Sequence, residues 1–142
     1  MASELKKRGI VTEYVPEYAK ELVWEGRRDR LDGSFKNQCH IFSKQHHRLQ
    51  RLIGKVDVIV TDAPLLLSAV YAKERKNDMS DFALEMHNQY NNFNLFINRG
   101  KHYEQAGRVH TLEQSKEIDR EIKAFLEEKI FTMVHIIIKP CL

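Results

Sequence analysis

The sequence predicts an α/β protein built on a mainly parallel sheet. The stretch Val56–Thr61 is an almost unbroken run of β-branched residues, which is typical of a strand buried on both faces of such a sheet. Pro64 prevents this strand from continuing, and Asp62 stands at its end. Elsewhere in the chain, segments with helical periodicity alternate with short apolar runs, and this alternation indicates strands joined by helices.

The first part of the chain is predicted to form a helix, a strand and a second helix. Glu4–Arg8 has the composition of the last turns of a helix, and Gly9 suits the position after its end. Ile10–Val15 is a short strand candidate, and Pro16–Trp24 follows as an amphipathic helix with proline at its start. The charged segment Arg27–Gly33 is expected to be a loop.

A long helix is predicted after Ser34, which is a suitable N-cap, and Gly54 ends it. Five apolar side chains and one histidine recur along it at steps of three and four residues. They belong to Phe35, Cys39, Phe42, His46, Leu49 and Ile53. Beyond the strand at 56–62 we expect a helix over residues 65–75, a break at 77–78, and a further helix that Ser80 caps and that runs to about residue 90.

The last third of the chain is predicted to hold two strands and one helix. Phe93–Ile97 is a strand, Arg99–His110 is a loop, and Thr111–Gln114 has the form of a capping box. The final strand is Ile130–Ile138, and Pro140 ends it. The buried face of the intervening helix is supplied by Ile118, Ile122, Phe125 and Leu126.

Bulk properties describe one ordinary domain, which we expect to cover residues 1–142. The formal net charge of +3 is too small to indicate nucleic-acid binding by itself. No apolar run approaches the ~20 residues that span a bilayer, and the N-terminus lacks the apolar core of a signal peptide. Two distant cysteines indicate free thiols in a reducing compartment, so we expect a cytoplasmic protein.

Asp62 is the first candidate for a functional residue. Ligands of open α/β sheets bind at the carboxyl ends of strands, and in phosphate-transferring enzymes an aspartate at this place holds Mg²⁺ beside the phosphates of a nucleotide. Alternatively, Asp62 only caps the helix that begins near Pro64. Both hypotheses stay open at this point.

The phosphate-cradling loop that should accompany such an aspartate is missing from the sequence. This loop has the form G-x-x-x-x-G-K-S/T between a strand and a helix. Gly54-Lys55 and Gly100-Lys101 are the two Gly-Lys pairs, and neither has the earlier glycine or the following hydroxyl residue. The sequence therefore holds one half of a nucleotide site without the other half.

Three motifs occur in an order that resembles a known family. They are VPEYAKE at 15–21, VTDAPLL at 60–66 and RGKHYEQAGR at 99–108. Together they resemble the P-loop AAA-type domain related to the NadR ribosylnicotinamide kinase, especially the small ATPase-like or kinase-like proteins of that group carried by bacteriophages. The resemblance extends from about Glu4 to about Glu128 and implies ATP and Mg²⁺ as ligands.

The resemblance implies a role for two carboxylates. Asp62 corresponds to the Walker B-type aspartate, which acts on Mg²⁺ and on the attacking hydroxyl group. Glu17 lies where related kinases direct a carboxylate toward the phosphate acceptor. Glu17 is also explained as a first-turn acid that the helix dipole stabilises, and this alternative stays open.

The resemblance also implies a lid over the triphosphate. Arg99 and Arg108 correspond to lid arginines that neutralise charge as it shifts, and Lys101 lies between them. Tyr103 either stacks on a base or packs within the lid. The two arginines are alternatively solvated loop charges.

The chain departs from the family pattern at its beginning, because it starts inside the first helix of the pattern. The resemblance therefore implies a three-layer sandwich of P-loop kinase type that is N-terminally truncated, without the first central strand and the phosphate loop. Each unmet buried hydrogen bond costs about 1–3 kcal/mol, against a total stability of about 5–15 kcal/mol. We expect the remaining strands to re-pair, or a protein partner or a second copy to complete the sheet.

Two other kinds of site are not expected. His40, His46 and His47 follow one another at spacings of six and one, and neither spacing places a pair of metal ligands on one helix face. Basic residues gather at Lys6–Arg8, Arg27–Arg30 and Lys44–Arg51. Acidic residues are interspersed throughout the chain, which favours solvated surfaces and phosphate steering over nucleic-acid binding.

Three functional hypotheses remain. The first is an ATP-binding, nucleoside-kinase-like protein whose catalysis is weak or absent in this form, because the missing loop supplies the backbone cradle and the lysine for the phosphates. The second is a non-catalytic binding or interaction protein derived from the same fold. The third is a fragment of a longer gene product without activity of its own.

Overall fold

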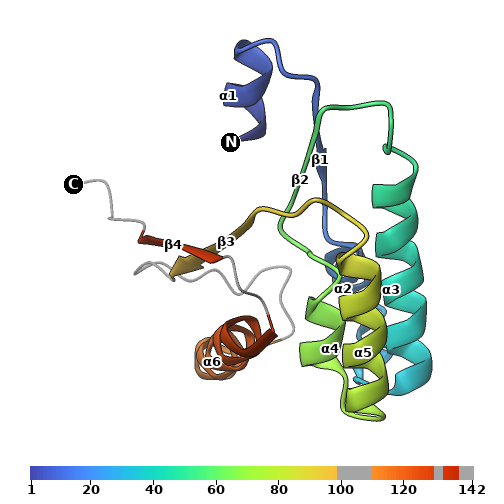
Figure 1. Cartoon of the computed structure of the whole chain (residues 1–142). Coiled ribbons are helices and arrows are strands. Elements are labelled where there is room, and N and C mark those ends of the chain that lie inside the picture. Colours follow the sequence, from blue (N-terminus) through green and yellow to red (C-terminus); the bar gives the residue numbers. More distant parts are fainter. Residues whose placement is uncertain (99–109, 130–132, 138–142) are drawn as a thin grey trace. The chain divides into compact units, whose positions relative to one another are not determined.

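The computed structural model describes residues 1–98, 110–129 and 133–137 of the chain (Figure 1). Its contacts divide the chain into two compact units, Met1–His87 and Asn88–Leu142, and each unit is described by itself.

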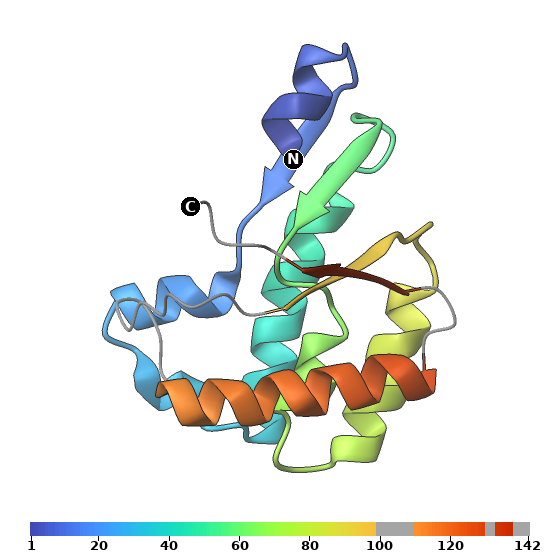
Figure 2. The ribbon, with the colours of Figure 1, turned by 90° about the vertical axis from the view of Figure 1, so that its left-hand side faces the viewer.

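The first unit contains a pair of parallel strands. Helix α1 (Ala2–Lys7) leads into β1 (Thr12–Val15), which pairs with β2 (Val58–Thr61), and the two strands lie side by side in both ribbon views (Figures 1 and 2). The register joins Thr12 to Val58 and Val15 to Thr61, so both strands end at the same level. Parallel pairing of these two segments confirms the α/β prediction.

The burial of β2 differs from the prediction. A strand buried on both faces was expected at 56–61, yet all four residues of β2 are half-buried. Among the described residues β2 pairs with β1 alone, so one backbone edge of β2 lacks a neighbouring strand. The well-buried positions of the pair lie on β1, where Thr12 and Val15 are 1% and 2% exposed.

A layer of helices forms the core of the first unit. Its elements are α2 (Tyr18–Trp24), the 3₁₀ turn η1 (Arg28–Leu31), α3 (Phe35–Gln50), α4 (Leu67–Tyr71) and α5 (Lys76–His87). As predicted, Ser34 caps α3, because its hydroxyl accepts a hydrogen bond from the Asn37 N–H at 3.4 Å. The rings of Phe42 and Phe82 pack at 4.9 Å between centroids and join α3 to α5. The buried apolar side chains of the helices include Leu22, Ile41, Leu49, Ala69, Val70, Met79 and Ala83.

The break between α4 and α5 comes earlier than predicted. A helix over 65–75 and a second one capped by Ser80 were expected, but α4 ends at Tyr71 and α5 already begins at Lys76. Two features place the break there. The Lys73 N–H leaves the helix to donate to the Gly33 carbonyl at 2.8 Å, and Arg75 adopts a left-handed conformation with φ +47°.

The α4–α5 connection is tied to the first turn of α3. The Glu74 carboxylate accepts a hydrogen bond from the Phe35 N–H at 2.9 Å, and the Arg75 guanidinium lies 4.0 Å above the centre of the Phe35 ring. Gly33 allows this approach: its φ is +79°, and a Cβ there would lie 2.9 Å from the Tyr71 carbonyl oxygen. We call these contacts the α3 clasp.

The second unit has a strand–helix–strand order. Strand β3 (Asn94–Asn98) pairs in parallel with β4 (Met133–Ile137), and α6 (Leu112–Lys129) lies between them in sequence. The predicted capping box is confirmed: Thr111 N–H donates to Gln114 Oε1 at 2.8 Å, and Gln114 N–H donates to Thr111 Oγ1 at 3.3 Å. The predicted apolar face of α6 is half-buried.

The described residues therefore confirm a mixed α/β architecture with parallel strand pairing. They form two two-stranded sheets, and the three-layer sandwich and the single domain over residues 1–142 stay predictions. Within the same described ranges, no helix combines the length and the apolar character that crossing a membrane requires.

Candidate functional site

Two carboxylates lie at one edge of the β1–β2 pair. Because Val15 is in register with Thr61, the residues after these strand ends share the carboxyl edge of the sheet. Asp62 follows β2 directly and is exposed, and Glu17 follows β1 after Pro16 and is half-buried. This edge is where open α/β sheets bind their ligands.

Thr61 fixes the backbone around Asp62. Its hydroxyl donates a hydrogen bond to the Val15 carbonyl at 2.8 Å and accepts one from the Ala63 N–H at 3.1 Å. One side chain thus bridges the two strand ends and also closes the turn after β2. Asp62 is held between these two anchored positions.

Tyr14 brings a phenol group to the same place. Its side chain is partly exposed and lies near the carboxylates of Asp62 and Glu17. Partial desolvation and the negative charges of Asp62 and Glu17 together raise the pKa of Tyr14 above its ordinary value. The phenol therefore keeps its proton at neutral pH and can donate it to the Asp62 carboxylate in a hydrogen bond.

Tyr14 is not among the residues that the sequence predicts for the site. Along a strand, side chains alternate between the faces, so Tyr14, its partner Val60 and Asp62 lie on one face of the pair. This relation depends on the register of two segments that are far apart in sequence. Once Val15 is aligned with Thr61, the relation follows directly.

Asp62 does not cap the following helix. Helix α4 has Leu66 at its N-cap position without a side-chain cap, and the Leu67 N–H donates to the Pro64 carbonyl at 3.0 Å. The capping alternative for Asp62 is therefore wrong, and its exposed carboxylate is available on the strand edge.

Glu17 occupies the N-cap position of α2, but its side chain makes no capping hydrogen bond. Gln45 of α3 takes that part: its Oε1 accepts from the Tyr18 N–H at 2.9 Å, and its Nε2 donates to the Pro16 carbonyl at 3.3 Å. Gln45 is 5% exposed, so it anchors the end of β1 from inside the core. Glu17 still lies at the positive end of a helix, where its charge is stabilised.

The remaining predicted site residues lie outside the described part of the chain. They are Arg99, Lys101, Tyr103 and Arg108. The structure therefore brings together Asp62 and Glu17 from the predicted set, and adds Tyr14 and Thr61 to them.

The donor set at the strand edge suits a hard cation. Magnesium prefers oxygen ligands, and proteins commonly hold it with one or two carboxylates while water and substrate phosphates fill the other positions. Asp62 provides an exposed carboxylate of this kind. Across residues 1–98, 110–129 and 133–137, no group of three or more His, Cys, Asp or Glu side chains forms a metal cage.

Comparison with known proteins agrees with the α/β fold. No curated protein and no solved structure matches the chain. A family model described as an AAA domain matches residues 1–140, which is nearly the whole sequence. The chain therefore belongs to the AAA-domain family, whose members are of the P-loop NTPase type.

Proposed function

We propose that this chain is an ATP-binding, nucleoside-kinase-like member of its family, similar to the small kinase-like proteins of bacteriophages. Asp62 holds Mg²⁺ beside the nucleotide phosphates, and Glu17 faces the phosphate acceptor. One observation carries the proposal: Glu17 and Asp62 follow the paired ends of β1 and β2 at one carboxyl edge of the sheet, where their charges also act on Tyr14.

Each of the three groups has a distinct part in this proposal. Asp62 supplies the oxygen ligand, and the bound cation would neutralise charge on the phosphates. Tyr14 keeps its phenol proton near Asp62 and would donate it in a hydrogen bond to that carboxylate. Glu17 contributes a second negative charge, which favours a cation nearby and can accept a proton from a hydroxyl group.

We further propose that binding exceeds turnover in this polypeptide. The 142 residues contain no G-x-x-x-x-G-K-S/T, the loop that encloses the β- and γ-phosphates and aligns them for transfer. A metal and basic side chains attract a triphosphate, but attraction without alignment gives affinity rather than rate.

The test compares the wild-type chain with Asp62→Asn. Calorimetry should show that Mg²⁺ strengthens ATP binding to the wild type and not to the variant. Phosphate release and phosphorylation of ribosylnicotinamide should stay near background for both. Asp81→Asn, an exposed aspartate on α5, is the matched control and should bind Mg²⁺-ATP like the wild type.

Two results would contradict this proposal. Equal Mg²⁺ dependence in wild type and Asp62→Asn would remove the metal-binding role of Asp62. Turnover of about 1 s⁻¹, which is ordinary for kinases, that disappears in Asp62→Asn would show that other residues replace the missing loop.

The lid residues have a separate test. Arg99 and Arg108, with Lys101 and Tyr103 between them, are proposed to contact the nucleotide. Replacing both arginines with alanine should weaken ATP binding at least tenfold, about 1.4 kcal/mol. An unchanged dissociation constant would exclude this role.

A second candidate function is non-catalytic binding, and the open edge of β2 favours it. Among the described strands β2 pairs only with β1, and its residues are half-buried, so a strand from a protein partner or a second copy could extend the sheet. Light scattering after gel filtration tests self-association directly. A monomer at every concentration up to about 100 µM would leave only a different partner for this edge.

A further inference from the structure

Positive charge is concentrated on one segment of the chain. Residues 34–56 contain no aspartate or glutamate. The same 23 residues contain five basic side chains, in a chain whose formal net charge is +3, so the rest of the chain carries a net −2. The five are Lys36, Lys44, Arg48, Arg51 and Lys55.

The fold places most of this charge on one face of α3. Residues 36, 40 and 44 are four apart, and from 44 the series continues both as 47 and 51 and as 48 and 51 at steps of three and four, so the six positions share one side of the helix. We call Lys36, His40, Lys44, His47, Arg48 and Arg51 the basic face. From Lys36 to Arg51 it extends about 22 Å at 1.5 Å per residue.

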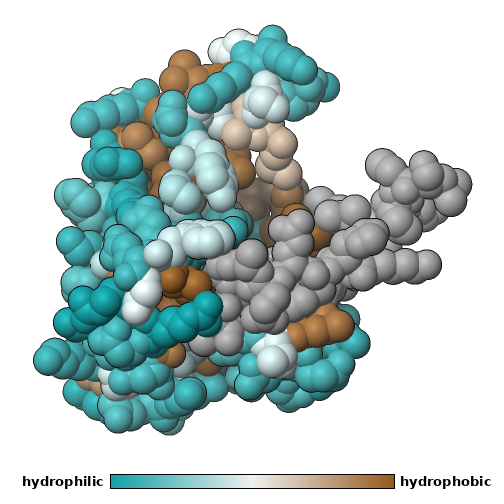
Figure 3. All heavy atoms as spheres, turned by 180° about the vertical axis from the view of Figure 1, so that it is seen from behind, coloured by the Kyte–Doolittle hydropathy of each residue, from teal (hydrophilic) through white to brown (hydrophobic). Residues whose placement is uncertain are grey.

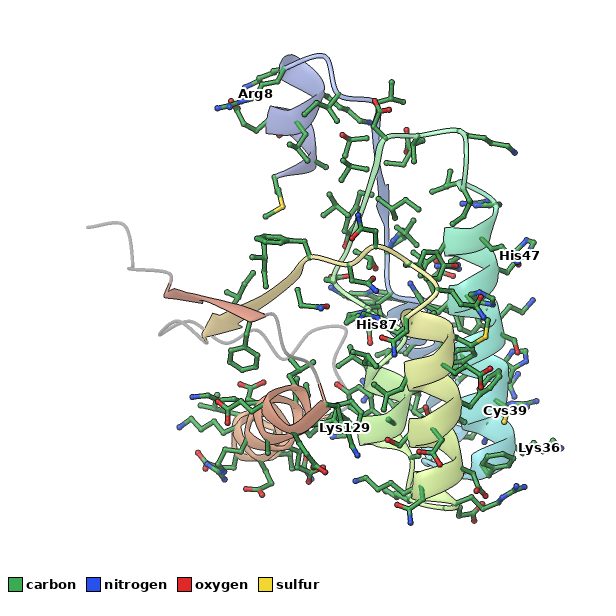
Figure 4. All side chains as sticks on the ribbon, viewed as in Figure 1. Arg8, Lys36, Cys39, His47, His87 and Lys129 are labelled. Carbon is green, nitrogen blue, oxygen red and sulfur yellow. The ribbon has the colours of Figure 1, made fainter. Side chains whose placement is uncertain are left out.

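The basic face points to solvent. All of its side chains are exposed except Arg48, which is half-buried. Figure 4 shows Lys36 and His47 on the outer side of α3, and Figure 3 shows mainly hydrophilic residues along the side of the first unit that carries this helix.

The cations of the basic face are largely available for a ligand. Within the described residues, the side chains of Lys36, Lys44 and Arg51 form no hydrogen bond and no ion pair, whereas cations on other helices do. Lys7 pairs with Glu4 on α1, and Arg120 pairs with Glu117 on α6.

The C-terminal half of the basic face lines an open cleft with a volume of about 400 Å³. Its lining residues are Pro16, Tyr18, Glu21, Lys44, His47, Arg48 and Arg51. Glu21, the one acidic residue in this lining, is neutralised by Arg48 Nη2 at 2.6 Å. The cleft therefore carries a net positive charge, and the Arg48–Glu21 ion pair joins α3 to α2 in its wall.

Tyr18, the aromatic residue that lines the cleft, already contacts Arg48 and His40. Tyr18 lies under the Arg48 guanidinium, which is 5.1 Å from its ring centre, and its hydroxyl is 3.2 Å from His40 Nε2. The ring is therefore not free to stack on an unpaired base, which is how single-stranded nucleic acid is usually held.

The basic face offers a row of cations but no free aromatic ring in its cleft on which a base could stack. Such a surface fits a polyanion with regularly spaced charges. Duplex nucleic acid presents one negative charge per ~1.7 Å of its axis, so the length of the basic face matches roughly 13 phosphates. We propose that the basic face binds the phosphate backbone of duplex nucleic acid without reading its sequence.

This proposal replaces the sequence-based expectation against nucleic acid. That expectation depended on acidic residues being interspersed throughout the chain, whereas residues 34–56 contain none. The basic face offers cations, whereas the edge formed by Tyr14, Asp62 and Glu17 offers carboxylates for a metal ion. Either proposal can therefore fail without the other.

The test measures fluorescence anisotropy of a labelled 20-base-pair DNA duplex. We expect a dissociation constant between about 1 and 100 µM at 50 mM salt, and a plot of log K against log salt with a slope near −3, about 0.9 per phosphate contact. Lys44→Gln/Arg51→Gln should weaken binding at least tenfold at 50 mM salt and make the slope shallower by about 2.

The matched control also removes two positive charges, but from α6. Lys116→Gln/Lys123→Gln should stay within twofold of the wild-type affinity, and circular dichroism should show that both double variants remain folded. Arg48 is kept, because its contacts with Glu21 and Pro16 hold the structure.

Four results would overturn the proposal. The wild type does not bind the duplex up to 100 µM, or the α6 control loses as much affinity as Lys44→Gln/Arg51→Gln. A single strand of the same length binds tenfold more tightly than the duplex. The protein is retained on phosphatidylserine vesicles and excess duplex does not displace it. The last result would assign the basic face to an anionic membrane instead.

Discussion

Gln45 is the side chain whose replacement tests most directly how the site edge is supported. It is 5% exposed and holds both the Tyr18 N–H and the Pro16 carbonyl, on either side of Glu17. In Gln45→Leu the Tyr18 N–H loses its partner, while the Pro16 carbonyl keeps a 3.4 Å contact with Arg48 Nη1.

The magnitude follows from these contacts. One buried donor left without a partner costs about 1–3 kcal/mol, and a partly compensated carbonyl costs about 1 kcal/mol more. The added leucine offsets about 1 kcal/mol through apolar burial. We expect Gln45→Leu to lower the free energy of unfolding by about 2 kcal/mol, the middle of this range.

Urea denaturation followed by circular dichroism measures this change. With a slope of about 2 kcal/mol/M, the midpoint should fall by about 1 M. Gln38→Leu is the matched control, because Gln38 lies on the same helix, is 4% exposed, and its side chain has no hydrogen-bond partner among the described residues. The control midpoint should move by less than ~0.3 M. Equal shifts in the two variants would refute the anchoring role of Gln45.

Two further predictions concern a turn and a buried imidazole. Gly33→Ala should destabilise the chain by at least about 1 kcal/mol more than Gly26→Ala. Both glycines have positive φ, but only at Gly33 would the added Cβ lie against the Tyr71 carbonyl. Equal urea midpoints for the two variants would exclude the steric effect. Burial lowers the pKa of His87, so the stability it contributes is present above the ordinary pKa of 6.5 and is lost as the pH falls through its lower value in the folded state. Melting temperatures from pH 8 to pH 4.5 should therefore decline less in His87→Gln than in the wild type, and parallel curves would contradict this origin.

Local signals in the sequence were sufficient for several elements. Ser34 and the Thr111–Gln114 capping box place helix starts correctly, because a cap involves residues only three positions apart. The start of α5 was wrong, because the break before it depends on Gly33, which lies 40 residues earlier than Lys73 and accepts its N–H.

The candidate site likewise contains residues that the sequence predicts and one that only the strand pairing identifies. Asp62 was predicted because it follows an apolar run and a strand end is a local feature, whereas Glu17 was predicted from the family resemblance, and the structure places both at one strand edge. Tyr14 was missed, because its relation to Asp62 exists only through the pairing of β1 with β2. The half-buried state of β2 was likewise missed, because burial depends on which strands become neighbours and composition does not encode that.

The α3 clasp has a consequence for the order in which the first unit can form. The Phe35 amide receives its acceptor from Glu74, which is 39 residues further along the chain. The first turn of α3 is therefore complete only after the chain has passed through β2 and α4 and has returned. Its amides should exchange with solvent deuterium at the rate of the α4–α5 amides rather than as a fraying helix end. Opening of the α3 clasp therefore exposes the amides of the first turn of α3 and those of the α4–α5 connection together. Hydrogen exchange at the start of α3, the longest helix of the first unit, thus reports on opening of the α4–α5 connection.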